Sequence, residues 1–213
     1  MIRGILFDLD NTLYSIKYGL EREMARRILA FICERLELSA DEAAQVRRQA
    51  VTTYGSSLAW LMAEKGFTDI DGYYAAIHPP GEEANLPADP KLRVFLENLY
   101  LPYAILTNSP REHTDRILAK LGVADLFTHI FDMRWNNLVG KPHPGAFQRA
   151  LEVLGTSPEE TLFVDDYPSY VEGYLKIGGV GVLMDEEDRH PDVPYPRVQS
   201  LEEVLALIIL DSL

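Results

Sequence analysis

The sequence has very little cysteine, because Cys33 is the single one among 213 residues. No intrachain disulfide can therefore form, and this fits a reducing compartment, so we expect a cytoplasmic protein. Long hydrophobic runs are lacking as well. The N-terminal run Ile5–Phe7 is stopped by Asp8, and the C-terminal run Val204–Leu210 is too short to span a bilayer. The composition therefore predicts neither secretion nor membrane insertion.

Positive charge is also scarce, with 20 Lys and Arg against 33 Asp and Glu and a formal net charge of −13. Nucleic acids and anionic membranes are bound through clustered Lys and Arg, so this balance argues against both as partners. An acidic protein can still bind a small phosphate if a cation and a few directed donors gather at one place. A metal site accompanied by a lysine is the feature to expect in that case.

Hydrophobic residues make up 47% of the chain and charged residues 25%, which is typical of a folded globular protein. Short apolar runs predict buried strands at Gly4–Asp8, Tyr103–Thr107, Thr161–Val164 and Val180–Leu183. Helical patterns occur at Pro90–Leu99, Arg111–Leu121, Pro144–Leu154, Ser169–Ile177 and Leu201–Ile209. This alternation predicts an α/β fold with a parallel sheet covered by helices on both faces.

One region departs from the alternation of strands and helices. Residues 15–86 have no convincing strand pattern, but they have helical patterns at Leu20–Leu36, Asp41–Glu64 and Asp69–Ala76. The sequence therefore predicts a core domain of residues 1–14 and 87–213 and a helical insertion of residues 15–86. The acidic, proline-containing segment Asp185–Pro196 is expected to be a surface loop.

Ligands of parallel α/β sheets bind outside the carboxyl ends of the strands, so the polar residues near those ends are the candidates for a site. They are Asp8 with Asp10, Thr107 with Asn108, Lys141, and Asp165 with Asp166. Each has a structural alternative when taken alone. The aspartates suit turns and helix caps, Thr107 and Asn108 suit a turn before Pro110, and Lys141 suits an exposed surface position.

Together the four groups supply the parts that phosphoryl transfer to a carboxylate needs. A nucleophilic carboxylate requires Mg²⁺ to reduce its repulsion of the phosphate, and Asp8 and Asp166 can provide the hard oxygen ligands that Mg²⁺ prefers. Hydroxyl, amide and ammonium groups then stabilise the charge on the transferring oxygens. Thr107, Asn108 and Lys141 are expected to bind the substrate phosphate in this way.

The run Asp8-Leu9-Asp10-Asn11-Thr12, followed in order by Thr107, Lys141 and Asp165-Asp166, resembles the motifs of the haloacid dehalogenase-like (HAD) phosphohydrolase superfamily. The resemblance extends over nearly the whole chain. It implies a Rossmann-like core with a small helical cap inserted after the first strand, which agrees with the predicted insertion. A lid of this kind implies a small phosphorylated metabolite as the substrate.

The resemblance also implies a role for each of the four aspartates. Asp8 would be the nucleophile and the first Mg²⁺ ligand, and Asp10 would be the general acid/base with its backbone carbonyl also on the metal. Asp166 would complete the protein ligands, and Asp165 would support the metal site through water. Asp8 and Asp10 are therefore expected to be the catalytic residues.

Three segments are similar to the pyrimidine 5′-nucleotidase branch of the superfamily, which implies a nucleoside monophosphate such as UMP or CMP as substrate. They are Asp10-Asn11-Thr12-Leu13-Tyr14, Tyr54-Gly55 and Lys141-Pro142-His143. The two tyrosines are either core aromatics or substrate contacts, and His143 either orients Lys141 or starts a helix.

Tyr170 departs from the superfamily pattern, which commonly has Asn or Asp at the fourth position after the metal-binding aspartate. The usual second support of the metal site is therefore missing or supplied differently.

Other functions remain open on the same core. A sugar-phosphate phosphatase or a phosphomutase has the same motifs, whereas a haloalkanoate dehalogenase does not need the carboxylate of Asp10. An alternative of another class is a non-catalytic interaction protein that keeps the fold, against which the intact Asp8 and Asp10 argue. The sequence does not indicate an oligomeric state.

Overall fold

The computed structural model describes residues 1–211, and it describes side chains as far as Ile208. The chain divides into two compact units. Met1–Tyr18 and the chain from Leu86 onward form the core unit, and Gly19–Asn85 form the helical unit. Within the described residues, no helix combines the length and the apolar character that crossing a membrane requires.

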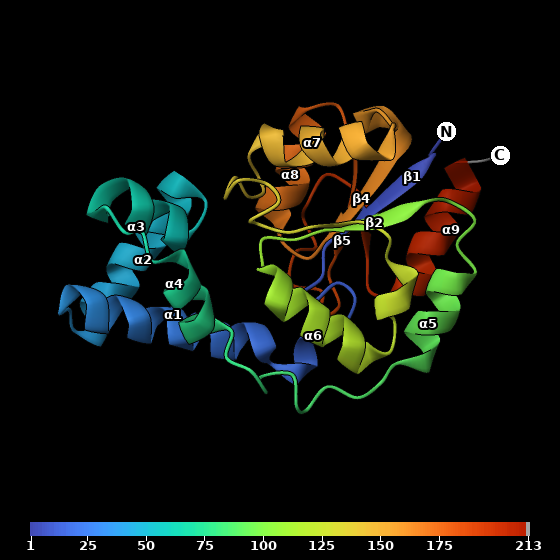
Figure 1. The fold of residues 1–213 in the computed structure, drawn as a ribbon. Coiled ribbons are helices and arrows are strands. Elements are labelled where there is room, and N and C mark those ends of the chain that lie inside the picture. Colours follow the sequence, from blue (N-terminus) through green and yellow to red (C-terminus); the bar gives the residue numbers. More distant parts are fainter. Residues whose placement is uncertain (212–213) are drawn as a thin grey trace. The chain divides into compact units, whose positions relative to one another are not determined.

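In the described part of the chain, the core unit contains a six-stranded parallel sheet (Figure 1). The strands are β1 (Gly4–Phe7), β2 (Tyr103–Leu106), β3 (Ile130–Phe131), β4 (Thr161–Asp165), β5 (Val180–Met184) and β6 (Arg197–Val198). Their order is β3-β2-β1-β4-β5-β6, so the winding direction reverses between β1 and β4. Open α/β sheets bind ligands at such a reversal, beyond the carboxyl ends of the strands.

Helices cover both faces of this sheet, with α7 and α8 on one face and α5, α6 and α9 on the other (Figure 1). Their bounds are α5 (Pro90–Glu97), α6 (Arg111–Leu121), α7 (Pro144–Leu154), α8 (Pro168–Lys176) and α9 (Leu201–Asp211). Single 3₁₀ turns lie at Ile16–Tyr18, Ala124–Leu126 and Pro158–Glu160. The predicted α/β fold, with a parallel sheet between two helical layers, is confirmed.

The hydrophobic core on the α7 and α8 face is closely packed. Its buried members are Leu6, Ala104, Leu106, Phe131, Phe147, Ala150, Leu151, Phe163 and Tyr174. A Cβ on Gly173 of α8 would lie only 2.6 Å from the Cβ of Pro142, so glycine allows this helix to approach closely the segment that carries Lys141.

The helical unit consists of α1 (Leu20–Leu36), α2 (Ala40–Tyr54), α3 (Ser57–Lys65) and α4 (Ile70–Ile77). The helical pattern predicted over Asp41–Glu64 forms two helices in the structure. Gly55 ends α2 in a left-handed conformation with φ of 78°, and the Ser56 side chain caps α3 by accepting a hydrogen bond from the Ala59 N–H. A glycine stop followed at once by a serine cap therefore divides the apolar pattern into two helices.

The strands β3 and β6 were not predicted, because two residues are too few to display an alternating pattern. The other four strands lie within one residue of their predicted ends. In particular, Asp8 and Thr107 follow β1 and β2 rather than ending them. Their side chains therefore belong to the edge of the sheet where a ligand would bind.

Candidate active site

The register of the sheet brings Asp8 and Asp165 together. Phe7 of β1 pairs with Val164 of β4, so the next residue on each strand is an aspartate. The Asp8 N–H continues the ladder by donating to the Val164 carbonyl at 2.8 Å. One carboxylate oxygen from each of Asp8, Asp165 and Asp166 lies within 4.8 Å of the other two. Parallel pairing of two strands thus builds an acidic cluster at the reversal point.

Lys141 enters this cluster as a buried cation. Its Nζ donates to Asp8 Oδ1 at 2.6 Å and to Asp165 Oδ2 at 2.5 Å, and the residue is only 2% exposed. The ring centroids of Phe163 and Tyr170 lie 5.4 and 5.1 Å from the same Nζ, within the range of cation–π attraction. The alternative that Lys141 is an exposed surface lysine is therefore wrong.

The electrostatics of the cluster leave a surplus of negative charge. Burial raises the pKa of Asp8 to about 8, with Lys141 opposing the rise and Asp165 and Asp10 adding to it. Burial likewise raises the pKa of Asp165. For Lys141, burial lowers the pKa, but the charges of Asp165 and Asp8 outweigh it and raise the pKa. One ammonium can balance one carboxylate, so another carboxylate needs a proton or a metal cation.

The donor set fits a small divalent cation. Both oxygens of Asp165 are engaged, Oδ2 with Lys141 and Oδ1 with the Tyr167 N–H at 2.8 Å. Asp166 is half-buried, and its Oδ2 accepts a hydrogen bond from Asn11 Nδ2 at 3.0 Å. Carboxylate oxygens in this number suit Mg²⁺, with Asp8 and Asp166 better disposed as direct ligands than the fully engaged Asp165.

Binding of Mg²⁺ to this cluster should release a proton. Because the pKa of Asp8 is raised to about 8, a proton occupies the metal-free carboxylate below that pH and must leave when the cation binds. We expect Mg²⁺ affinity to rise with pH and to level off above about pH 8. Calorimetric titrations in buffers of different ionisation enthalpy measure the released proton, and Asp8→Asn should remove it. Affinity that stays constant from about pH 6 to about pH 8 would contradict this expectation.

The raised pKa of Asp8 also determines how the unfolding free energy depends on pH. The folded pKa of Asp8 lies above the value of 3.8 for an unperturbed Asp, so the folded state binds more protons than the unfolded one between these values. The contribution of Asp8 to the unfolding free energy of the metal-free protein therefore falls as pH rises through this window. Added Mg²⁺ should offset the loss.

Asn108, in the segment after β2, holds the backbone of Lys141 in place. Asn108 pairs with the Lys141 backbone, since its Nδ2 donates to the Lys141 carbonyl at 2.9 Å and its Oδ1 accepts from the Lys141 N–H at 2.8 Å. A Cβ on Gly140 would lie 2.7 Å from Asn108 Oδ1, so this close pairing requires glycine there. Thr107 is 1% exposed, and its Oγ1 accepts from the Ser109 N–H at 3.0 Å.

Asp10 has partners that the sequence did not predict. Its Oδ1 accepts hydrogen bonds from the Tyr14 hydroxyl at 2.5 Å and from His113 Nε2 at 2.7 Å, and its Oδ2 accepts from Ser109 Oγ at 2.7 Å. Ser109 and His113 stand two and six residues after Thr107. The polarity of Ser109 just after β2, and of His113 in the first turn of α6, was the available signal.

The remaining candidates from the sequence are Tyr54, His143 and Tyr170, and each has an identified partner. Tyr54 forms a hydrogen bond with Glu64 inside the helical unit. His143 caps α7, because its Nδ1 accepts from the Gly145 N–H at 3.1 Å, so the helix-start alternative is confirmed. The Tyr170 ring faces Lys141, with its centroid 5.1 Å from Nζ. The residue that replaces the usual Asn or Asp therefore supports the lysine segment.

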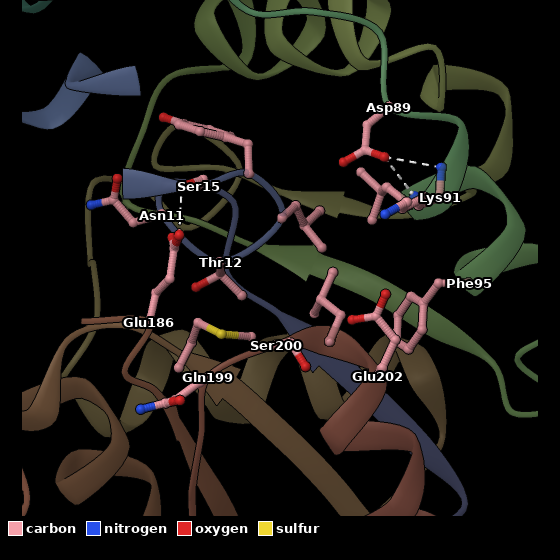
Figure 2. A pocket seen from close by; sticks show the side chains of 15 residues that line it. Asn11, Thr12, Ser15, Asp89, Lys91, Phe95, Glu186, Gln199, Ser200 and Glu202 are labelled. Carbon is pink, nitrogen blue, oxygen red and sulfur yellow. Dashed lines mark hydrogen bonds between the residues drawn. The ribbon is translucent and has the colours of Figure 1, made fainter. Parts of the chain in front are cut away.

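The core unit also has a pocket of about 220 Å³ (Figure 2). It is lined by the segment after β1, the start of α5, the end of β5 and the start of α9. Asp8, Lys141, Asp165 and Asp166 are not among its lining residues. This hollow is therefore distinct from the acidic cluster.

The fold is a Rossmann-like core with a cluster of aspartates at the ends of its strands. The model of the haloacid dehalogenase-like hydrolase family matches residues 2–169. The chain belongs to this family, and the resemblance seen in the sequence motifs is confirmed at that level.

Relatives with assigned names are moderately similar. The chain is 30% identical over 197 residues to Phosphate metabolism protein 8 of Saccharomyces cerevisiae, which covers 85% of this chain and 61% of that protein. The chain thus spans less than two thirds of that relative's length. It is 29% identical over 174 residues to Phosphoglycolate phosphatase of Pectobacterium atrosepticum, covering 78% of this chain and 72% of the relative.

Two further similarities extend over nearly the whole chain. Identity to Glyceraldehyde 3-phosphate phosphatase of Methanocaldococcus jannaschii is 26% over 223 residues, covering 96% of this chain and 97% of the relative. The crystal structure of a HAD phosphatase from Thermococcus onnurineus aligns with a TM-score of 0.65 at 21% identity, covering 97% of this chain and 98% of that one. The latter similarity concerns the fold.

Proposed function

We propose that the protein is a Mg²⁺-dependent phosphatase of small phosphomonoesters in which Asp8 is the nucleophile. The observation that carries this proposal is the buried bridge from Lys141 to both Asp8 and Asp165, beside the third carboxylate of Asp166. A buried lysine fixed next to a nucleophilic carboxylate supplies positive charge where a phosphate would arrive. A structural ion pair alone would not need two more carboxylates at the same strand ends.

The proposed reaction has two steps. In the first, an Asp8 oxygen attacks phosphorus and the bond from phosphorus to the ester oxygen breaks. Asp10 enters this step as the neutral acid and gives its proton to the leaving oxygen. In the second, water attacks the phosphorus of the aspartyl phosphate and gives a proton to Asp10. The bond to Asp8 then breaks and inorganic phosphate leaves, so both carboxyl groups return to their starting forms.

Mg²⁺, held by Asp8, Asp166 and the Asp10 carbonyl, would neutralise charge on the phosphate and the carboxylate. Lys141 binds the phosphate oxygens and keeps Asp8 in position, and Asn108 holds the Lys141 backbone. The Thr107 hydroxyl, one residue beyond β2, is the proposed donor to the same phosphate.

Phosphorylated sugars and related small acids are the proposed substrate class. The names of the phosphoglycolate and glyceraldehyde 3-phosphate phosphatases among the relatives favour it. Pyrimidine nucleoside monophosphates are the second candidate, carried by the similarity of the segments around Tyr14 and His143 to the nucleotidase branch. The net charge of −13 supports a small substrate over a polyanion in both cases.

A phosphate-release screen with and without Mg²⁺ tests the proposal. We expect glyceraldehyde 3-phosphate and phosphoglycolate to be hydrolysed faster than UMP and CMP, and chelation of the metal to stop all of these reactions. Preference for UMP or CMP would overturn the substrate class but not the phosphatase. Chloride release from 2-chloropropionate without phosphatase activity would replace it by a dehalogenase. No hydrolysis together with a specific protein partner would favour a non-catalytic role.

A further inference from the structure

The carboxylate of Asp10 is held by donors from two separate segments of the core unit. Tyr14 lies four residues further on in the segment after β1, and its hydroxyl donates to Oδ1 at 2.5 Å. Ser109 and His113 lie 99 and 103 residues further along the chain and donate at 2.7 Å to Oδ2 and Oδ1, respectively. Both carboxylate oxygens are therefore engaged, so rotation about the terminal carboxylate bond is restricted.

The side chains of Asp10 and His113 differ in their exposure to solvent. The His113 side chain is 2% exposed, whereas the Asp10 side chain keeps 21% of its surface. A substrate or an attacking water can thus reach Asp10, whereas His113, on α6, is shielded from solvent. His113 is in the first turn of that helix, so its backbone is fixed relative to β2 and to Thr107, the proposed phosphate donor.

The donors are themselves held in place. Ser109 is 6% exposed, and its N–H donates to the Thr107 hydroxyl at 3.0 Å. This connects the hydroxyl proposed to bind phosphate with the hydroxyl that holds Asp10. A proton donor must be correctly aligned with the leaving oxygen, and a misplacement of about 1 Å can cost about 10²-fold in rate.

We propose that His113, together with Tyr14 and Ser109, is a positioning residue that aligns the Asp10 carboxyl group for proton transfer to the leaving oxygen. This inference rests on the proposed phosphatase function and deepens it. In this role His113 contacts Asp10 and touches neither the phosphate nor the leaving group. Its effect should therefore depend on how much the leaving oxygen needs a proton.

The test is a comparison of two ester types in His113→Ala. An alkyl phosphate has a poor leaving group that needs general-acid assistance, whereas 4-nitrophenyl phosphate has a good one that does not. We expect kcat/KM of His113→Ala to fall roughly 10–100-fold for the alkyl ester and less than about 3-fold for the aryl ester. Asp10→Asn should show the same selectivity with a larger effect. His113→Gln, which can still present an N–H, should recover most of the alkyl activity.

Thr114→Val is the matched control on α6. Thr114 is fully buried next to His113, and its hydroxyl donates to the Pro110 carbonyl at 3.1 Å. This variant should leave the alkyl-to-aryl ratio unchanged. If His113→Ala does not fold, Tyr14→Phe removes another donor to Asp10 and should lower the same ratio.

Three results separate the possible failures. Equal losses for both esters in His113→Ala would assign His113 a purely structural role and overturn the inference. Unchanged kinetics of the alkyl ester in folded His113→Ala would also overturn it. Absence of Mg²⁺-dependent hydrolysis of either ester by the wild-type protein would instead refute the proposed function, and the inference with it.

Discussion

Asp8→Asn is expected to abolish turnover and to leave the fold intact. The amide is a poor nucleophile of nearly the same size, so the first chemical step is lost while the packing at the end of β1 is kept. Removing a residue that acts as nucleophile in a coupled catalytic group can cost on the order of 10⁶-fold in kcat. Burial already favours the neutral form of Asp8, so a neutral amide should not destabilise the metal-free protein.

Phosphate release and thermal unfolding of the same preparations measure both parts of this result. Asp192→Asn, at an exposed position, is the matched control and should behave like the wild type. A folded Asp8→Asn protein with the wild-type rate would exclude Asp8 as the nucleophile. Loss of the fold in the metal-free variant would show that the charge of Asp8 is needed for stability.

Lys141→Met is expected to reduce both activity and stability. Methionine replaces the lysine with a similar volume, but it leaves Asp8 and Asp165 without their shared buried cation. Removing one partner of a buried ion pair typically costs about 3–5 kcal/mol in the free energy of unfolding. Loss of a donor that stabilises transition-state charge typically lowers kcat by about 10²–10³-fold.

Denaturant unfolding with and without Mg²⁺, together with kcat for a simple aryl phosphate, measures these effects. Added Mg²⁺ should restore part of the stability, because a second cation then balances the carboxylates. Lys176→Met, at an exposed position in the last turn of α8, should change neither quantity substantially. Unchanged stability and kinetics in Lys141→Met would show that neither the fold nor the activity needs Lys141.

Much of the fold follows from local patterns. The ranges Leu20–Leu36, Arg111–Leu121 and Pro144–Leu154 were predicted as helices with the ends that the structure has. Strong apolar periodicity combined with capping glycines such as Gly122 and Gly155 explains this agreement. The two-residue strands β3 and β6 were missed because their pairing is determined by neighbouring strands and not by their own sequence.

The two compact units divide after Tyr18 and after Asn85, whereas the predicted insertion was residues 15–86, so Ser15 and Lys17 lie in the core unit. Both residues contact Glu186, which follows β5 closely. A long-range contact of this kind has no local signal. That the helical unit selects substrates by size stays a prediction.

The sequence by itself determined the fold class, the family and the order of the chemical groups, because strand-end motifs and apolar periodicity are local properties of the chain. Only the tertiary structure decided what each group contacts. The burial of Lys141 between Asp8 and Asp165, and the hold of Ser109 and His113 on Asp10, depend on strand register and on the position of α6. Contacts between residues about a hundred positions apart arise from packing, which no local pattern encodes.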